Sequence, residues 1–412
     1  MNGAGRFWFF GRLTGVVVLL FSVGCSDGLL NISSTNNYNN NQTQTAIVIN
    51  GNGDGITDPS ETPQIMTYNG QYASWYGGSN EPNWPLASPS ATLLGNGQIL
   101  LAGGGLTGNV NSGNTTNAAY LYNPQNNSWT ATGSMVFDRN SFTLVTLHSG
   151  NALAIGGCVA GCTGNSLHSD SIGMIYQDVE EYNAVTQTWT NMASVSSENS
   201  NHFMTNNPGA VVLQNGNVLV CGGANGFTYN TYCDIFNPGS NTWTATGSWL
   251  SGQNASQTEE PMTLLPNGNV VYVSNGNSAI NWGQVEIYNG ASWANLTNQP
   301  STLRLANPIV LNNGNIVLIG GRTFTNIPVT NIDIYNSSLQ TWSSGGTLPT
   351  TTAVPMVSLM SSGNILIEGG YTNSTFTTLT ASAYIYNPTT QTLLPVGSLF
   401  TAISEGFLFL VP

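Results

Sequence analysis

The side chains that could bind an acidic group are few in this sequence. Its 412 residues include only five Lys and Arg residues and three His. After residue 24, the lysines and arginines are limited to Arg139, Arg304 and Arg322. A guanidinium group binds a carboxylate through two parallel hydrogen bonds. The three arginines are therefore candidates for binding a uronic acid, a sialic acid or an acidic side chain.

Two further polar residues could complete such a site. His202 and Glu259 are a possible acid–base pair, because an imidazole beside a carboxylate can move a proton. We expect Arg304 and Arg322 to form an anion-binding pair, with His202 and Glu259 on the same rim. The alternative is that the arginines, Arg139 included, are structural and tie neighbouring units of the fold together. No catalytic residue is predicted.

One loop has some of the spacing of a calcium site. In "NGNGDGITDPSE", residues 50–61, the side chains of Asn50, Asn52, Asp54 and Glu61 fall near the positions of a calcium-binding loop. The first position is Asn, however, and no helices are expected on either side. An ordinary connecting loop is the alternative, and no other metal or cofactor is predicted.

The N-terminus has the features of an export signal. Residues 1–24 contain two arginines and then an apolar run at 13–23, which is too short to span a bilayer as a helix. The letters "SVGC" resemble a bacterial lipobox, in which Cys25 would carry the lipid; an ordinary signal-peptidase site is the alternative. Residues 25–44 are predicted to be a flexible tether of about 25 Å. We expect an exported protein in the periplasm or at the cell surface, with an outer membrane lipoprotein as the favoured form.

An even number of cysteines remains when Cys25 is set apart, and an even number in an exported protein favours disulfides. Cys221 ends one predicted strand and Cys233 begins the next, so a disulfide can join them. Cys158 and Cys162 could close a small loop. A metal site that includes His168 is the alternative.

The composition excludes several classes of partner. Charged residues make up 6% of the chain, and the formal net charge is −13. Binding to nucleic acid or to anionic lipid depends on Lys and Arg, so neither is expected as a partner. Contact with a membrane is predicted through the lipid anchor only.

The elements that must position these residues come from a repeat. The phrase "LNNGNIVLIGGR" at 311–322 is one of six related copies in the chain, each followed by a second phrase such as "IDIYNSSLQTW" at 332–342. Each pair of phrases predicts four short strands, named a to d here. In one copy these strands are "PMTLL" (a), "NVVYVSN" (b), "QVEIYN" (c) and "SWANL" (d). A Tyr or Phe stands seven residues before the Trp in most copies, which predicts contact across the c–d hairpin.

A four-stranded unit of about 50 residues with a Gly-Gly pair and a Tyr…Trp hairpin resembles a kelch repeat of the galactose oxidase/kelch superfamily. The resemblance covers residues 45–412 and implies an all-β, seven-bladed β-propeller. "SEGFLFLVP" at 404–412 is expected to be strand a of the seventh blade. It would pair with N-terminal strands b to d, from "TAIVINGNG" at 45–53 and "MTYNGQYASW" at 66–75, and so close the ring.

The order of the strands predicts which face is functional. The a–b turns are uniformly short, whereas the b–c and d–a connections vary in length and meet at the other face. Variable loops on a rigid scaffold are where binding sites usually occur. By contrast, an acidic residue recurs two places before the strand-c aromatic, which indicates a structural role for Glu180, Asp234, Glu286 and Asp333.

Three classes of function fit the resemblance. Copper radical oxidases of the superfamily need two Tyr, two His and a Cys–Tyr cross-link, but this chain has three His and places His148 in an a–b turn. A sugar-acid mutarotase or glycan-processing enzyme could use His202 with a nearby carboxylate. The favoured interpretation is a binding module for a glycan or protein ligand on the b–c/d–a face. Many Asn, Thr, Tyr and Trp residues suit neutral sugars.

Overall fold

The computed structural model is an all-β structure. It describes residues 89–105, 115–158, 179–193, 208–225, 228–229, 231–250, 262–273, 284–296, 306–323, 327–375 and 377–399, and the strands at 19–21, 45–49, 64–69, 74–77 and 407–411. Within these ranges, no helix has the length and apolar character needed to cross a membrane.

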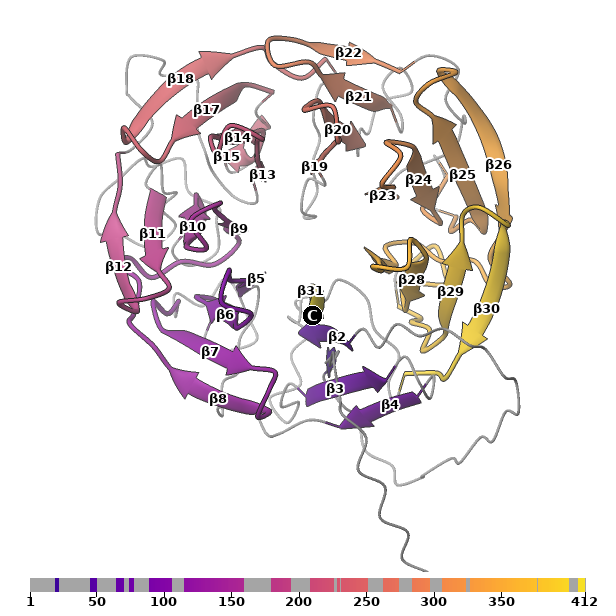
Figure 1. Cartoon of the computed structure of the whole chain (residues 1–412), viewed down its shortest axis with the longest axis horizontal. Helices are drawn as coiled ribbons and strands as arrows, with labels where there is room; N and C mark the ends of the chain where they lie inside the picture. Colours follow the sequence, from indigo (N-terminus) through magenta and orange to yellow (C-terminus); the bar gives the residue numbers. More distant parts are fainter. Residues whose placement is uncertain are drawn as a thin grey trace, which may run out of the picture.

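Six four-stranded antiparallel sheets stand around a common axis as the blades of a propeller (Figure 1). Blade one contains β5 (Ser90–Leu93), β6 (Ile99–Ala102), β7 (Ala119–Asn123) and β8 (Ser128–Ala131). Blade two contains β9 (Thr143–Thr146), β10 (Ala152–Ile155), β11 (Val179–Asn183) and β12 (Thr188–Asn191). Blade three contains β13 (Gly209–Val212), β14 (Val218–Cys221), β17 (Cys233–Asn237) and β18 (Thr242–Thr246).

The second half of the ring has the same construction. Blade four contains β19 (Met262–Leu264), β20 (Val270–Val273), β21 (Val285–Tyr288) and β22 (Trp293–Asn295). Blade five contains β23 (Asn307–Val310), β24 (Ile316–Ile319), β25 (Asn331–Asn336) and β26 (Thr341–Thr347). Blade six contains β27 (Met356–Leu359), β28 (Ile365–Glu368), β29 (Ala383–Asn387) and β30 (Thr392–Val396). In each blade the strands follow the predicted order a, b, c, d from the axis outward.

A further sheet lies between blade six and blade one and is called the closing sheet here (Figure 1). Its strands are β31 (Phe407–Val411), β2 (Thr45–Ile49), β3 (Gln64–Asn69), β4 (Ser74–Gly77) and β1 (Leu19–Phe21). C-terminal β31 pairs with N-terminal β2, with Ile47 opposite Phe409. The pairing of the two chain ends therefore has the predicted partners.

The closing sheet differs from the predicted blade. The sequence predicts seven blades of one kind, whereas the structure shows six four-stranded blades and one five-stranded sheet. The extra strand, β1, comes from the apolar run that was assigned to the export signal. β2 pairs only with the second half of β3, and β1 occupies the same edge of β3 opposite residues 64–66. Backbone groups that β2 leaves unpaired are satisfied by β1.

The repeated turns have a local cause. In the a–b turn of blade one, Gly97 has a φ of 81°, which a side chain would disfavour, and its N–H donates to the carbonyl of Leu94. In the c–d turn of blade three, the side-chain oxygen of Asn237 accepts a hydrogen bond from the backbone N–H of Gly239 at 2.9 Å. Asn mimics a backbone turn in this way, which explains its recurrence at the end of strand c.

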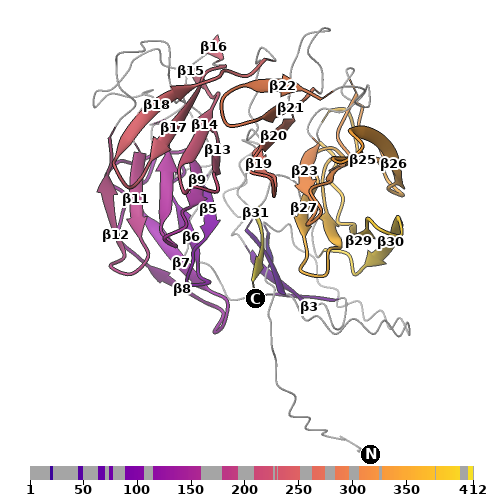
Figure 2. The same cartoon turned by 45° about the horizontal axis from the view of Figure 1, so that its top comes forward.

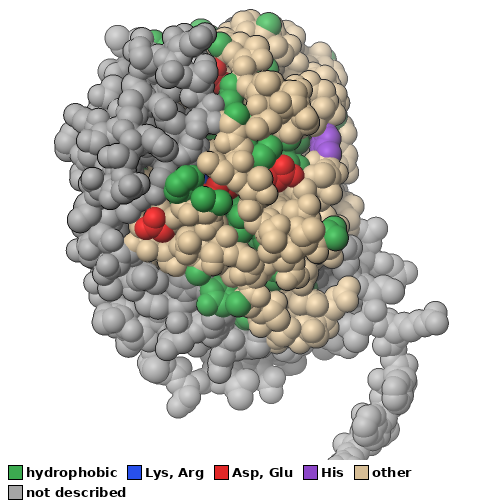
Figure 3. Space-filling model, turned by 90° about the vertical axis from the view of Figure 1, so that its left-hand side faces the viewer, with side chains coloured by type: hydrophobic (Ala, Val, Ile, Leu, Met, Phe, Trp, Pro, Cys, Tyr) green, Lys and Arg blue, Asp and Glu red, His purple; other side chains and the backbone are tan. Residues whose placement is uncertain are grey.

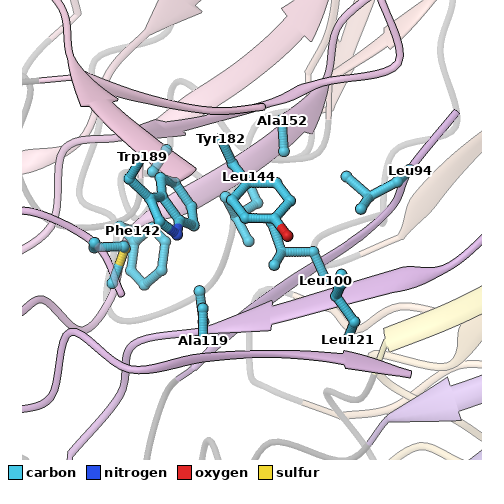
Figure 4. Packing of buried hydrophobic residues seen from close by; sticks show 12 residues of the cluster. Leu94, Leu100, Ala119, Leu121, Phe142, Leu144, Ala152, Tyr182 and Trp189 are labelled. Carbon is cyan, nitrogen blue, oxygen red and sulfur yellow. The ribbon is translucent and has the colours of Figure 1, made fainter. Parts of the chain in front are cut away.

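The core consists of apolar layers between neighbouring blades. Figure 4 shows the layer between blades one and two, where Leu100 and Leu121 meet Leu144 and Tyr182. The predicted contact across the c–d hairpin is confirmed, with the rings of Tyr182 and Trp189 5.1 Å apart. Because each layer is shared, no blade buries its apolar faces alone.

Polar atoms of the same aromatics join the blades. The indole N–H of Trp189 donates to the carbonyl of Gly133 in the preceding blade at 2.8 Å. Trp243 bonds the carbonyl of Ala193 at 2.7 Å in the same way. The hydroxyl of Tyr386 donates to the carbonyl of Gly345 in blade five at 2.7 Å. These bonds link the outer strands of successive blades.

Candidate binding face

The b–c and d–a connections meet at one end of the ring, which is called the loop face here. Figure 2 shows the hairpin of β15 (Ala224–Asn225) and β16 (Thr228–Tyr229), within the b–c connection of blade three, projecting beyond the blades. In blade two, the d–a segment pairs with the b–c connection through Asn140 and Cys158. Ala353 and Tyr371 pair likewise in blade six. In these two blades, the two kinds of connection are therefore hydrogen-bonded to each other.

The Gly-Gly pairs make room for these segments. The N–H of Gly104, after β6, donates to the carbonyl of Arg139 at 2.8 Å. A Cβ on Gly157, after β10, would lie 2.7 Å from the carbonyl oxygen of Asn140. The segment that enters blade two thus rests on the glycine pairs of blades one and two. This packing explains why the pair recurs in the sequence.

Arg139 is part of this support. Its side chain is 0% exposed, and its Nη2 lies 2.5 Å from Oε1 of Glu180. Its Nη1 donates to the carbonyl of Gly156 at 2.7 Å. Oε2 of Glu180 also accepts the backbone N–H of Val136 at 2.5 Å. The guanidinium group therefore binds other groups of the protein, which agrees with the alternative that Arg139 has a structural role.

The repeated carboxyl groups hold the d–a connections. Glu286 accepts the backbone N–H of Leu250 at 2.9 Å, which repeats in blade four the bond between Val136 and Glu180 in blade two. Val136 and Leu250 are left 50% and 53% exposed on the loop face. In blade five, Oδ2 of Asp333 has no hydrogen-bond partner, and burial raises the pKa of its carboxyl group.

One carboxyl group was missed by the sequence interpretation. Glu368 ends β28, is 0% exposed, and has no hydrogen-bond partner at either carboxyl oxygen. Burial raises its pKa well above the usual range. The signal was present in the repeat, because the residue before the Gly-Gly pair is apolar in the other copies that have the pair.

The structure places one other member of the predicted anion site. Arg322 follows the Gly-Gly pair of β24, is 8% exposed, and pairs its backbone with Pro328. It belongs to blade five, whereas Arg139 belongs to the entry of blade two, so the two are not brought together. His202, Glu259 and Arg304 lie outside the described residues. So do Cys25, Cys162 and the candidate calcium residues Asn50, Asn52, Asp54 and Glu61.

The predicted disulfide between Cys221 and Cys233 is confirmed. The two residues face each other across β14 and β17, and their sulfur atoms are 2.06 Å apart. Both are buried. Cys158 is also disulfide-bonded, while its predicted partner Cys162 is not among the described residues.

The b–c connection of blade six presents neutral hydrogen-bonding groups. The amide of Asn373 donates to the hydroxyls of Thr377 at 2.7 Å and Thr378 at 3.0 Å. Its oxygen accepts the backbone N–H of both residues at 3.0 Å. Both threonines are exposed, so this connection offers positioned hydroxyl groups to solvent.

The described surface carries few charges. Figure 3 shows one side of the ring, where uncharged side chains and backbone cover most of the described area. In the ranges that the structure covers, no three His, Cys, Asp or Glu side chains gather to form a candidate metal site.

Comparisons with known proteins identify the fold. No protein-family model matches the sequence, and no curated protein is significantly similar to it. A solved structure described as a fungal alcohol oxidase of the AA5 family in complex with copper is similar with a TM-score of 0.57 and 15% identity. The match covers 77% of this chain and 66% of that one.

A second solved structure, that of YjhT, has a TM-score of 0.52 and 15% identity, and the match covers 76% of this chain and 98% of that one. At 15% identity, both likenesses concern the fold alone. Together with the six blades, they show a β-propeller fold.

Proposed function

We propose that this propeller is a binding module whose loop face takes a glycan or protein ligand. The observation that carries the proposal is the way in which the loop face is built. Buried carboxyl groups of Glu180 and Glu286 hold the d–a connections by accepting their backbone N–H groups. Exposed aliphatic side chains and the hydroxyls held by Asn373 point outward. A rigid surface of neutral hydrogen-bonding and apolar groups suits sugar hydroxyls and ring faces.

Within this proposal, acidic groups of the ligand bind at Arg304 and Arg322, with His202 and Glu259 on the same rim. Arg139 is left out of the contact set because its side chain is fully buried in the ion pair with Glu180. In a chain with a net charge of −13, a fixed arginine is a selective site for a uronic acid, a sialic acid or an acidic side chain.

We also propose that the protein is exported and anchored through Cys25. Cleavage before Cys25 removes β1 and leaves β31, β2, β3 and β4 as a four-stranded seventh blade. Support for the seventh blade comes from the ring of contacts, in which β31 touches both β27 and β5. The tether at 25–44 then holds the ring away from the membrane.

Binding to an array of glycans and surface proteins tests the proposed function. We expect the mature protein to bind a neutral or acidic glycan or a protein on the array. Arg322→Ala and Asn373→Ala should weaken binding at least about tenfold, since each removes a hydrogen-bonding group. His148→Ala, in an a–b turn at the opposite face, is the control. Equal weakening by the control, or binding that ignores both loop-face substitutions, would contradict the proposal.

A further inference from the structure

Glu368 is a carboxyl group at a position that the repeat keeps apolar. Its counterparts at the end of strand b in blades one to five are Ala102, Ile155, Cys221, Val273 and Ile319. All of these are buried, as is Glu368 at 0% exposure. Neither of its carboxyl oxygens has a hydrogen-bond partner. An ionised carboxylate in such a place is strongly disfavoured, so the group is held in its neutral form.

Strand alternation shows which side of blade six this carboxyl faces. Ile365 and Ile367 of β28 pack in one cluster with Val317 and Ile319 of blade five. Successive residues of a strand point to opposite faces, so Glu368 points away from blade five. The closing sheet lies on that side, where β27 contacts β31 (Figure 1). Glu368 therefore belongs to the layer between blade six and the closing sheet.

The sequences of the adjoining strands contain no charged residue. Neither β27 nor β29, which flank β28, contains Asp, Glu, His, Lys or Arg, and the same holds for β31, β2, β3 and β4. Their titratable residues are tyrosines: Tyr384 and Tyr386 in β29, Tyr68 in β3 and Tyr76 in β4. Tyr386 is turned to blade five, where its hydroxyl bonds Gly345. The neighbouring described segments 348–355, 369–375 and 377–382 also contain no Asp, Glu, His, Lys or Arg.

We propose that proton loss from Glu368 loosens the junction between blade six and the closing sheet, so that the contribution of this group to the stability of the ring is greatest in acid and declines as the pH rises. An unfolded chain releases this proton near pH 4.3, about the ordinary value for Glu. Below that pH both states are protonated and the full stability is present. Above it, only the folded state retains the proton. The ratio of folded to unfolded protein then falls by up to about tenfold per pH unit, until the folded group also ionises.

The test is urea unfolding of the mature protein from pH 4 to pH 8, with Glu368→Gln, which cannot ionise. The stability of Glu368→Gln relative to the wild type should rise with pH, by up to about tenfold in the folding equilibrium per unit. Glu181→Gln is the matched control, because Glu181 is only half-buried and accepts a hydrogen bond from Asn151 at 2.7 Å. Its difference from the wild type should stay nearly constant over the same range.

A second variant covers the case in which Glu368→Gln does not fold. Glu368→Ile restores the residue of blades two and five and should give the same rising difference. Infrared difference spectra supply a direct readout: at about pH 6, where an exposed Glu is ionised, the wild type should show a protonated-carboxyl component that is missing from both variants, whereas any contribution of Asp333 is common to all three proteins and cancels. A stability difference that does not change with pH, or a missing band at that pH, would overturn the proposal.

Discussion

At the scale of single residues, the loop face is built on a buried ion pair. Arg139 and Glu180 are both 0% exposed, and the carboxylate also accepts backbone N–H groups of Val136 and Phe137. Removing one member of a buried pair costs more than the pair contributes, because it leaves an uncompensated charge. The arginine that looked available for a ligand is therefore needed by the scaffold.

This role predicts strong energetic coupling. Arg139→Met should lower the free energy of unfolding by about 3–5 kcal/mol, because Glu180 would stay buried without its cation. Glu180→Gln should cost less in the Arg139→Met background than in the wild type. A double-mutant cycle measured by urea unfolding gives the coupling, expected at about 0.5–3 kcal/mol. Purely additive effects would mean that the two groups act independently.

The glycine pair gives a second residue-scale prediction. Gly157→Ala combines a φ of 91° with a Cβ placed 2.7 Å from the carbonyl oxygen of Asn140. Gly97→Ala is the matched control, since its φ is 81° and nothing lies within 4 Å of its Cβ. We expect the control to cost about 1 kcal/mol from backbone strain. Gly157→Ala should cost about 1–3 kcal/mol more from overpacking, as measured by urea unfolding. Equal losses of unfolding free energy in the two variants would show that the new Cβ at position 157 fits beside the carbonyl of Asn140 without destabilising the fold.

At the scale of elements, blade three is fastened by a disulfide between two of its own strands. The disulfide between Cys221 and Cys233 joins strands b and c across 12 positions of sequence separation. Its loop is the b–c connection, which includes the β15–β16 hairpin at the loop face. The covalent link therefore restrains a connection that backbone pairing also holds.

Removing that link should weaken the protein measurably. The double variant Cys221→Ala, Cys233→Ala should lose about 3 kcal/mol of unfolding free energy, the amount expected for a loop of this length. Reduced wild-type protein should melt at or below the temperature of the variant, because reduction also breaks the disulfide of Cys158. An unchanged melting temperature in both would show that this disulfide does not stabilise the fold.

At the scale of the whole molecule, stability depends on the junctions of the ring. Every described blade shares its apolar layers with neighbours, and the innermost strands contact one another in the order β5, β9, β13, β19, β23, β27 and β31. The closing sheet takes one strand from the C-terminal end and the others from the N-terminal end. The two ends of the chain must therefore meet for the ring to be complete.

Deletion of residues 404–412 tests this dependence. The deletion removes β31 and leaves β2 without its partner at the axis. Because unpaired strand edges promote association, we expect aggregation or the loss of a single cooperative melting transition. Calorimetry and light scattering on the exported protein measure both effects. A soluble, truncated protein with the wild-type melting temperature would show that β31 is dispensable.

Much of this fold could be predicted because it is a repeat. The spacing of the Gly-Gly pair, Tyr182 and Trp189 determined strands, turns and hairpin contacts, since these depend on residues close together in the chain. The Cys221–Cys233 bridge followed from the same local order. The ends of the chain were assigned to one sheet because their letters matched strands of the repeat.

Only the tertiary structure decided which polar side chains are buried and paired within the fold. The sequence placed Arg139 and Arg322 on one face, but the burial of Arg139 against Glu180 depends on how the segment that enters blade two packs on β11, where Glu180 lies 41 residues further along the chain. Glu368 departs from an apolar position of the repeat, so the sequence could have marked it, but its complete burial without a hydrogen-bond partner depends on the layer that surrounds it. Periodic patterns report contacts along the chain, whereas the state of a charge is set by neighbours that are distant in sequence.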